Sequence, residues 1–99
     1  MRLKADEVDS IKESVNQIFG QKVSVWLFGS RADDTKKGGD IDLYLEVPSK
    51  TYSSMQKNRL WATLIQKLGD QKIDIVINRL GLSNNLPIYD VAKRTGVKL

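Results

Sequence analysis

Residues 27–47 read LFGSRADDTKKGGDIDLYLEV, and this stretch decides the fold. From residue 40 onward apolar and mostly polar side chains alternate, which is typical of a β-strand with one buried face. The apolar positions are Ile41, Leu43, Leu45 and Val47, and the positions between them are Asp40, Asp42, Tyr44 and Glu46. Just upstream, residues 23–28 form a short β-branched and aromatic run, which predicts a second, buried strand. Because the connection over residues 29–39 is short, we expect the two strands to be antiparallel.

Hydrophobic periodicity predicts the remaining elements outside this pair of strands. We expect helices over 6–19, 53–68 and 87–94, and a third strand over 72–77. Asp6 and Ser53 are the expected N-caps of the two long helices. Trp61 falls in the apolar stripe of the second helix and is expected to be buried. Pro87 suits the first turn of the last helix.

The order of these elements defines the fold class. The second strand, the long helix after it and the third strand form a crossover unit, so those two strands should be parallel. We therefore expect an α/β (α+β) domain with a small mixed three-stranded sheet and helices packed on it. Counting a short helix after the first strand, the order is α-β-α-β-α-β-α. The 99 residues fit a single domain, residues 1–99.

Composition limits the chemistry that the chain can perform. It has no cysteine and no histidine, so catalysis must rest on carboxylates, hydroxyls, backbone amides, Lys and Arg. A hard cation with oxygen ligands, such as magnesium, fits this inventory. The net charge of +4 is ordinary for a soluble protein and is also compatible with attracting a nucleotide. No apolar run approaches the ~20 residues of a membrane span, and the start lacks a secretory signal, so we expect a cytoplasmic protein.

Three carboxylates are the candidate metal ligands. Asp40 and Asp42 lie two residues apart on one strand, so their side chains leave the same face. Asp74 sits near the start of the neighbouring parallel strand and can join them. Crowded carboxylates repel one another, and one or two divalent cations would neutralise them. Two such ions can clamp the attacking and leaving oxygens of a phosphoryl transfer.

The turn after the first strand is the candidate phosphate site. Gly29 lets the backbone approach a phosphate closely, and the Ser30 hydroxyl can donate a hydrogen bond to it. Arg31 can either neutralise the triphosphate or orient its own loop by pairing with a carboxylate. Weaker candidates for nucleotide contacts are Lys36, Lys37 and Arg79. Each feature alone has an ordinary structural explanation, as a turn or a solvated strand face, and only their convergence at one corner of the sheet indicates a site.

Gly29-Ser30, Asp40-x-Asp42 and Asp74 together resemble the signature of the DNA polymerase β nucleotidyltransferase superfamily. The similarity extends from the first helix to the third strand. The small size resembles the minimal nucleotidyltransferase branch, whose antitoxin-like members pair with HEPN toxins, and residues 73–79 and 86–89 look like that branch as well. The spacer between Ser30 and Asp40 is nine residues, where the family more often has ten.

The resemblance implies a magnesium-dependent nucleotidyltransferase. Asp40 and Asp42 would bind two Mg²⁺ ions, and Asp74 would complete the metal site and help to deprotonate the acceptor hydroxyl. Gly29 and Ser30 would hold the triphosphate of ATP. The implied reaction transfers AMP from ATP to a tyrosine of a HEPN ribonuclease toxin and releases pyrophosphate. The chain would then be a type VII-like antitoxin.

Two other functions stay open at this point. The chain could neutralise a partner by covering it, without catalysis. It could also transfer a nucleotide to a small molecule such as an aminoglycoside, or to an RNA end. Enzymes of that kind usually carry an added acceptor-binding domain, for which these 99 residues leave little room. The weak basic character argues against nucleic acid as a direct ligand.

Overall fold

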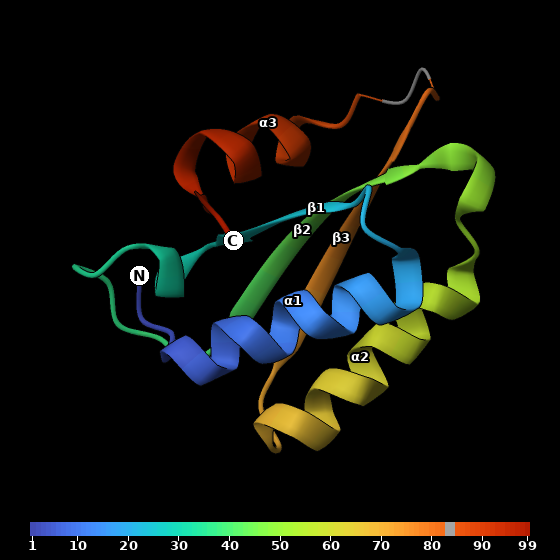
Figure 1. Ribbon diagram of the computed structural model, residues 1–99. Coiled ribbons are helices and arrows are strands. Elements are labelled where there is room, and N and C mark those ends of the chain that lie inside the picture. Colours follow the sequence, from blue (N-terminus) through green and yellow to red (C-terminus); the bar gives the residue numbers. More distant parts are fainter. Residues whose placement is uncertain (83–84) are drawn as a thin grey trace.

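The computed structural model describes residues 1–82 and 85–99, and in that part of the chain three α-helices accompany a four-stranded sheet (Figure 1). In chain order the elements are α1 (Ala5–Phe19), β1 (Ser24–Phe28), η1 (Ser30–Ala32), β2 (Ile41–Pro48), η2 (Ser49–Thr51), α2 (Ser54–Leu68), β3 (Ile73–Leu80), α3 (Pro87–Thr95) and β4 (Val97–Lys98), where η marks a short 3-10 helix. The predicted elements are all present. β3 continues three residues beyond the predicted end at residue 77.

The sheet has the strand order β3-β2-β1-β4. β1 runs antiparallel to β2, and β2 runs parallel to β3, which confirms both predictions. The expected number of three strands is wrong by one, because Val97–Lys98 pairs with β1. Two residues are too few to show a period-two pattern, so only the pairing itself reveals β4.

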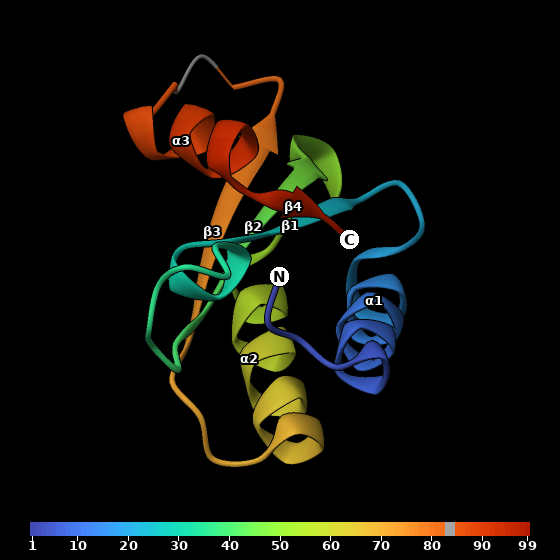
Figure 2. The ribbon, with the colours of Figure 1, turned by 90° about the vertical axis from the view of Figure 1, so that its left-hand side faces the viewer.

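The sheet lies between α3 on one face and α1 and α2 on the other (Figure 2), and each face carries its own apolar layer. α1 and α2 lie against one face and enclose the larger layer with the buried side of β2. Fully buried residues of this layer include Ile11, Leu27, Ile41, Leu43, Leu45, Leu60 and Leu64. No helix in residues 1–82 and 85–99 is long and apolar enough to cross a membrane.

α3 covers the opposite face and encloses a smaller aromatic layer. The ring of Tyr44 packs between those of Trp26 and Tyr89, with centroids 5.3 and 5.8 Å away. The Tyr44 hydroxyl donates a hydrogen bond to Glu46 (2.8 Å) and accepts one from Asn78 (2.9 Å). Tyr44 is therefore fully buried although it lies on the mostly polar side of the alternation. Asp42, on the same face near the beginning of β2, lies outside this aromatic layer and is only partly buried.

Helix ends and faces follow local chemistry, with two departures from expectation. Ser53 caps α2 as predicted, since its hydroxyl accepts from the Met55 N–H. The predicted cap Asp6 is wrong: α1 begins after Lys4, whose N–H donates to Glu7 at 3.0 Å. Trp61 is also not buried, and 48% of its surface is exposed. The buried side of α2 is defined by Leu60 and Leu64. A step of 100° around the helix carries Trp61 off that side.

Candidate active site

Two carboxylates meet where β2 and β3 begin. Asp42 and Asp74 are register partners on adjacent parallel strands, so their side chains leave the same side of the sheet. The two side chains therefore lie near each other at the same end of the sheet. Burial raises the pKa of Asp42 above its ordinary value, and the negative charges of Asp74 and Asp40 raise it further. The fold thus holds like charges together, at a cost that a neighbouring cation would remove.

Asp40 lies just before β2, and its carboxylate is turned toward Lys72. The distance from Lys72 Nζ to Asp40 Oδ2 is 3.7 Å, and both side chains are well exposed. An ion pair this exposed contributes little to stability and can open easily. Within the described ranges, no group of three acidic side chains is arranged to hold a metal ion. The structure therefore brings Asp42 and Asp74 together, while the role of Asp40 as a third ligand stays a prediction.

The chemistry of this pair fits a hard divalent cation. Asp42 and Asp74 offer carboxylate oxygens, which magnesium prefers over nitrogen or sulfur. Asp42 is partly buried and Asp74 is exposed, so a cation can reach the pair from solvent. Their mutual repulsion supplies a reason for a cation to bind there.

Gly29 forms the wall next to this pair. Its φ of +75° is a backbone conformation that residues with a side chain rarely adopt. A Cβ on Gly29 would also collide with the carboxylate of Asp42. Two independent constraints therefore require glycine here. The close approach confirms the expectation that the turn after β1 lies beside Asp42.

Ser30 opens η1 directly after that turn. The end of the following loop folds back onto it, since a Cβ on Gly38 would lie 2.6 Å from the Ser30 hydroxyl. The Ser30 hydroxyl therefore lies close to Gly38, while Ser30 itself stays partly exposed. Phosphate binding by Gly29 and Ser30 stays a prediction; the structure brings Gly29 against the carboxylate of Asp42, and Ser30 follows it in the chain.

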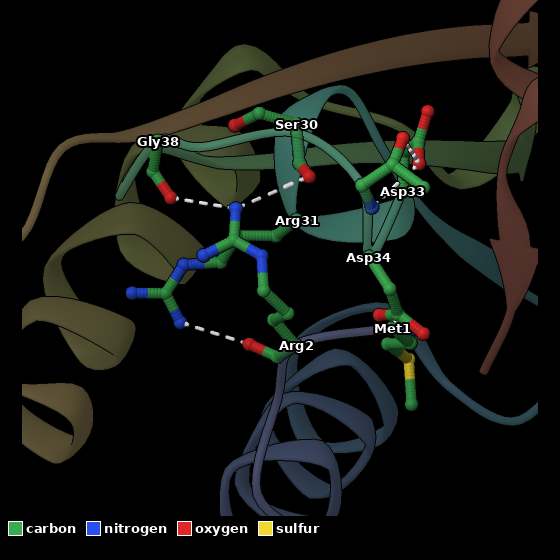
Figure 3. A network of polar contacts seen from close by, with 8 residues as sticks. Met1, Arg2, Ser30, Arg31, Asp33, Asp34 and Gly38 are labelled. Carbon is green, nitrogen blue, oxygen red and sulfur yellow. Dashed lines mark hydrogen bonds and ion pairs between the residues drawn. The ribbon is translucent and has the colours of Figure 1, made fainter.

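The Arg31 side chain lies against the N-terminal segment, next to Arg2 (Figure 3). Its guanidinium donates to the carbonyl oxygens of Gly39 (3.2 Å) and Arg2 (3.3 Å) and to the side-chain oxygen of Gln71 (3.0 Å). Of the two roles considered from the sequence, these contacts favour the loop-orienting one. The acceptors are neutral oxygens rather than the carboxylate that was expected.

Two hollows adjoin the site on different sides. One, of about 310 Å³, is lined by Phe28, Gly29, Asp33, Lys36, Val91 and Thr95. The other, of about 380 Å³, runs along the edge strand and is lined by Lys57, Asn58, Trp61 and residues 73–76, which include Asp74. A larger hollow of about 580 Å³ lies where Arg2 and Arg31 meet α1, and it contains none of the site carboxylates.

Sequence reasoning misjudged three further residues. Arg79 does not face the carboxylate pair, because it lies at the other end of β3 from Asp74, with its guanidinium 5.2 Å from the centre of the Tyr52 ring. Trp61, which the sequence predicts to be buried, lines a hollow with Asp74. Arg2 is a further residue of this corner, since its guanidinium donates a hydrogen bond to the Ser30 carbonyl. No local pattern marks Arg2, since the contact spans 28 residues of sequence.

Comparison with known families adds an independent finding. The family model of the nucleotidyltransferase domain matches residues 8–97. The match runs from the first turns of α1 to β4 and includes all the candidate site residues. No curated protein matches the chain.

Proposed function

The chain belongs to the nucleotidyltransferase domain family, and from this we propose that it transfers AMP from ATP to a tyrosine of a HEPN ribonuclease toxin, with magnesium, in the cytoplasm. The observation that carries the proposal is the Asp42–Asp74 pair with Gly29 directly against it. A triphosphate held at the glycine turn would lie beside both carboxylates. Cation binding and phosphate binding would then share one corner of the sheet.

The three carboxylates have different roles in the proposed reaction. Asp42 and Asp74 would hold the divalent cation, and Asp40 would join them on releasing Lys72. Bound divalent cations would neutralise the phosphates and align the attacking and leaving oxygens. Asp74, the more exposed of the pair, accepts the proton of the acceptor hydroxyl as that oxygen forms its bond to the α-phosphorus. The bond between the α-phosphorus and the bridging oxygen breaks, and pyrophosphate leaves.

The hollow at Gly29 supports the binding of a nucleotide. Lys36 brings a positive charge to the same hollow as the glycine turn, and Phe28 and Val91 add apolar surface. A nucleotide needs both, since its phosphates are anionic and its base is largely apolar on its faces. Asp33 lines the hollow too, but its carboxylate is occupied by hydrogen bonds from Thr35.

The edge of β3 supports a polypeptide as acceptor. The Ile41 N–H donates to the Lys72 carbonyl, and in a parallel ladder alternate residues face the neighbouring strand. Ile73 and Ile75 therefore direct their backbone groups toward the open edge, where an extended segment can pair with them. Trp61 and Asp74 line the hollow along this edge. A protein segment docked there would bring a tyrosine hydroxyl to Asp74.

The proposal is tested by transfer of label. The purified chain is incubated with Mg²⁺, ATP labelled on the α-phosphate, and a HEPN protein from the neighbouring reading frame with an Arg-x(4–6)-His motif. We expect label on a tyrosine of that protein and none with Asp42→Asn. Equal labelling by Asp42→Asn would refute the mechanism.

Other outcomes would identify the alternatives. Tight binding of the HEPN protein, without affinity for ATP in calorimetry, would identify an antitoxin that acts by binding alone. Label on an aminoglycoside, with none on the HEPN protein, would identify a small-molecule nucleotidyltransferase. Both results would overturn the proposed protein acceptor reaction.

A further inference from the structure

Arg2 and Arg31, which are distant in sequence, are hydrogen-bonded to each other next to Ser30 (Figure 3). The Arg2 N–H donates to the Arg31 carbonyl at 2.8 Å, and the Arg31 guanidinium donates back to the Arg2 carbonyl at 3.3 Å. The N-terminal segment is therefore tied to η1 by reciprocal bonds, one from backbone and one from a side chain.

The Arg2 side chain joins the two ends of the loop that follows the turn. One nitrogen, Nη2, donates to the carbonyl of Gly38 at 2.7 Å and to the carbonyl of Ser30 at 3.2 Å. Figure 3 shows the guanidinium lying between these two carbonyls. This bridge holds Gly38 against the Ser30 hydroxyl, the close approach at which a Cβ on Gly38 would clash.

The two guanidiniums also leave their charge uncompensated. In residues 1–82 and 85–99, neither Arg2 nor Arg31 forms an ion pair with a carboxylate. All of their hydrogen-bond acceptors are neutral oxygens. Charge-assisted hydrogen bonds of this kind are stronger than neutral ones. They fix the loop and at the same time keep positive charge next to Ser30, which favours an anion at the turn.

We infer that Arg2 is a positioning residue for the nucleotide site: by bridging Ser30 and Gly38 it sets the shape of the glycine turn and its loop. The inference rests on the proposed function, in which Gly29 and Ser30 hold the triphosphate. Arg2 itself need not touch the nucleotide. Small displacements of such a positioning element cost much of the affinity or rate.

The test compares Arg2→Gln, Arg2→Lys and the control Arg59→Gln, which removes the same charge from the exposed side of α2. Binding of ATP with Mg²⁺ is measured by calorimetry. We expect Arg2→Gln to weaken binding by roughly tenfold, in the range that misplaced binding groups produce. Arg2→Lys should restore most of the affinity, because one ammonium nitrogen can donate to both carbonyls. Arg59→Gln should bind like the parent chain.

Hydrogen exchange of the backbone amides of residues 29–39 supplies the second measurement. We expect faster exchange there in Arg2→Gln, with the exchange of the α1 and β2 amides unchanged. If Arg2→Gln does not fold, Arg2→Lys must retain both parental affinity and parental exchange. A lysine variant that lost affinity as fully as the glutamine variant would overturn the bridging role.

The measurements separate this inference from the proposed function. If the parent binds ATP and Arg2→Gln binds equally well, the positioning role is wrong and the proposed function stands. If the parent does not bind ATP, the proposed function fails, and the exchange of residues 29–39 decides the bridging role alone. Unchanged exchange in Arg2→Gln would then refute it.

Discussion

Asp42 and Asp74 are register partners on the parallel strands β2 and β3, so their carboxylates leave the same side of the sheet next to each other. Burial and the charge of Asp74 raise the pKa of Asp42, so its ionised form is disfavoured in the folded state. At neutral pH this contact lowers the stability of the metal-free protein. A bound divalent cation reverses the sign of the interaction, so stability reports on cation binding.

Asp42→Asn should therefore stabilise the metal-free protein while removing its response to magnesium. We expect Tm to rise by a few degrees without metal, since roughly 1 kcal/mol corresponds to about 4–8 °C in a domain of this size. Magnesium should raise the Tm of the parent but not of the variant. The control is Asp70→Asn, which removes an exposed carboxylate from the turn after α2. A lower Tm for metal-free Asp42→Asn, or equal stabilisation of both by magnesium, would contradict this account.

Much of the fold could be predicted because strong local periodicity coincides with burial. The alternation over β2 fixes which side chains face the helices, and Ile41 and Leu43 are indeed fully buried. Tyr44 shows where the pattern fails, because its burial depends on α3, which is far away in sequence. The prediction for Trp61 is wrong for a different reason. Trp61 lies next to the apolar stripe of its helix, and the position of the neighbouring strand decides which of these apolar residues is buried.

The site could be predicted where the sequence spacing itself sets the geometry. Asp42 and Gly29 are close because a short loop joins two antiparallel strands, and Asp74 joins them through the parallel register. Asp40 lies outside the strand, where its carboxylate is free to turn toward Lys72. Arg2 could not be found from spacing, because its position follows only from how the N-terminal segment packs against η1.

Gly29→Ala should disrupt the candidate site as well as strain the backbone. The matched control is Gly20→Ala, since Gly20 also has a positive φ, of 92°, but has nothing within 4 Å of a Cβ position. Both variants should lose about 1 kcal/mol from the backbone conformation. Only Gly29→Ala should also displace Asp42 and abolish transfer of label and the magnesium-dependent rise in Tm. Retained transfer by Gly29→Ala would contradict the close approach as a functional requirement.

Lys36→Ala should weaken ATP binding, whereas Lys37→Ala should not. Lys36 lines the hollow next to Gly29, and Lys37 is its exposed neighbour outside that lining. We expect the dissociation constant of ATP to rise several-fold for Lys36→Ala, and the difference to shrink as salt is added. Calorimetry at two ionic strengths measures both effects. Equal losses for both lysines would indicate a general charge effect rather than a contact in the hollow.

Tyr44 should make the fold sensitive to alkali. Burial raises the pKa of Tyr44 to about 12, above the ordinary tyrosine value of about 10. The stability contributed by the neutral phenol is therefore fully present below about pH 10 and is lost as the pH rises toward 12. Over this window the free energy of unfolding, measured with urea, should fall more steeply for the parent than for Tyr44→Phe. Tyr52→Phe is the control, and parallel curves for the parent and Tyr44→Phe would contradict the prediction.

Trp61→Ala should impair transfer to the protein acceptor without impairing ATP binding. Trp61 is 48% exposed, so its removal should cost little stability. It lines the hollow with Asp74 along the open edge of β3, where the acceptor segment is expected to dock, and exposed tryptophans often dominate such contacts.

The KM for the HEPN protein should rise by about tenfold in Trp61→Ala, as expected for loss of an interface tryptophan, while the dissociation constant of ATP stays constant. Met55→Ala, which removes another exposed apolar side chain from α2, is the matched control and should leave both constants unchanged. Steady-state labelling at varied concentrations of the HEPN protein separates KM from kcat. An unchanged KM in Trp61→Ala would place the acceptor elsewhere, because Trp61 and Asp74 line the same hollow and a segment docked in it should contact both.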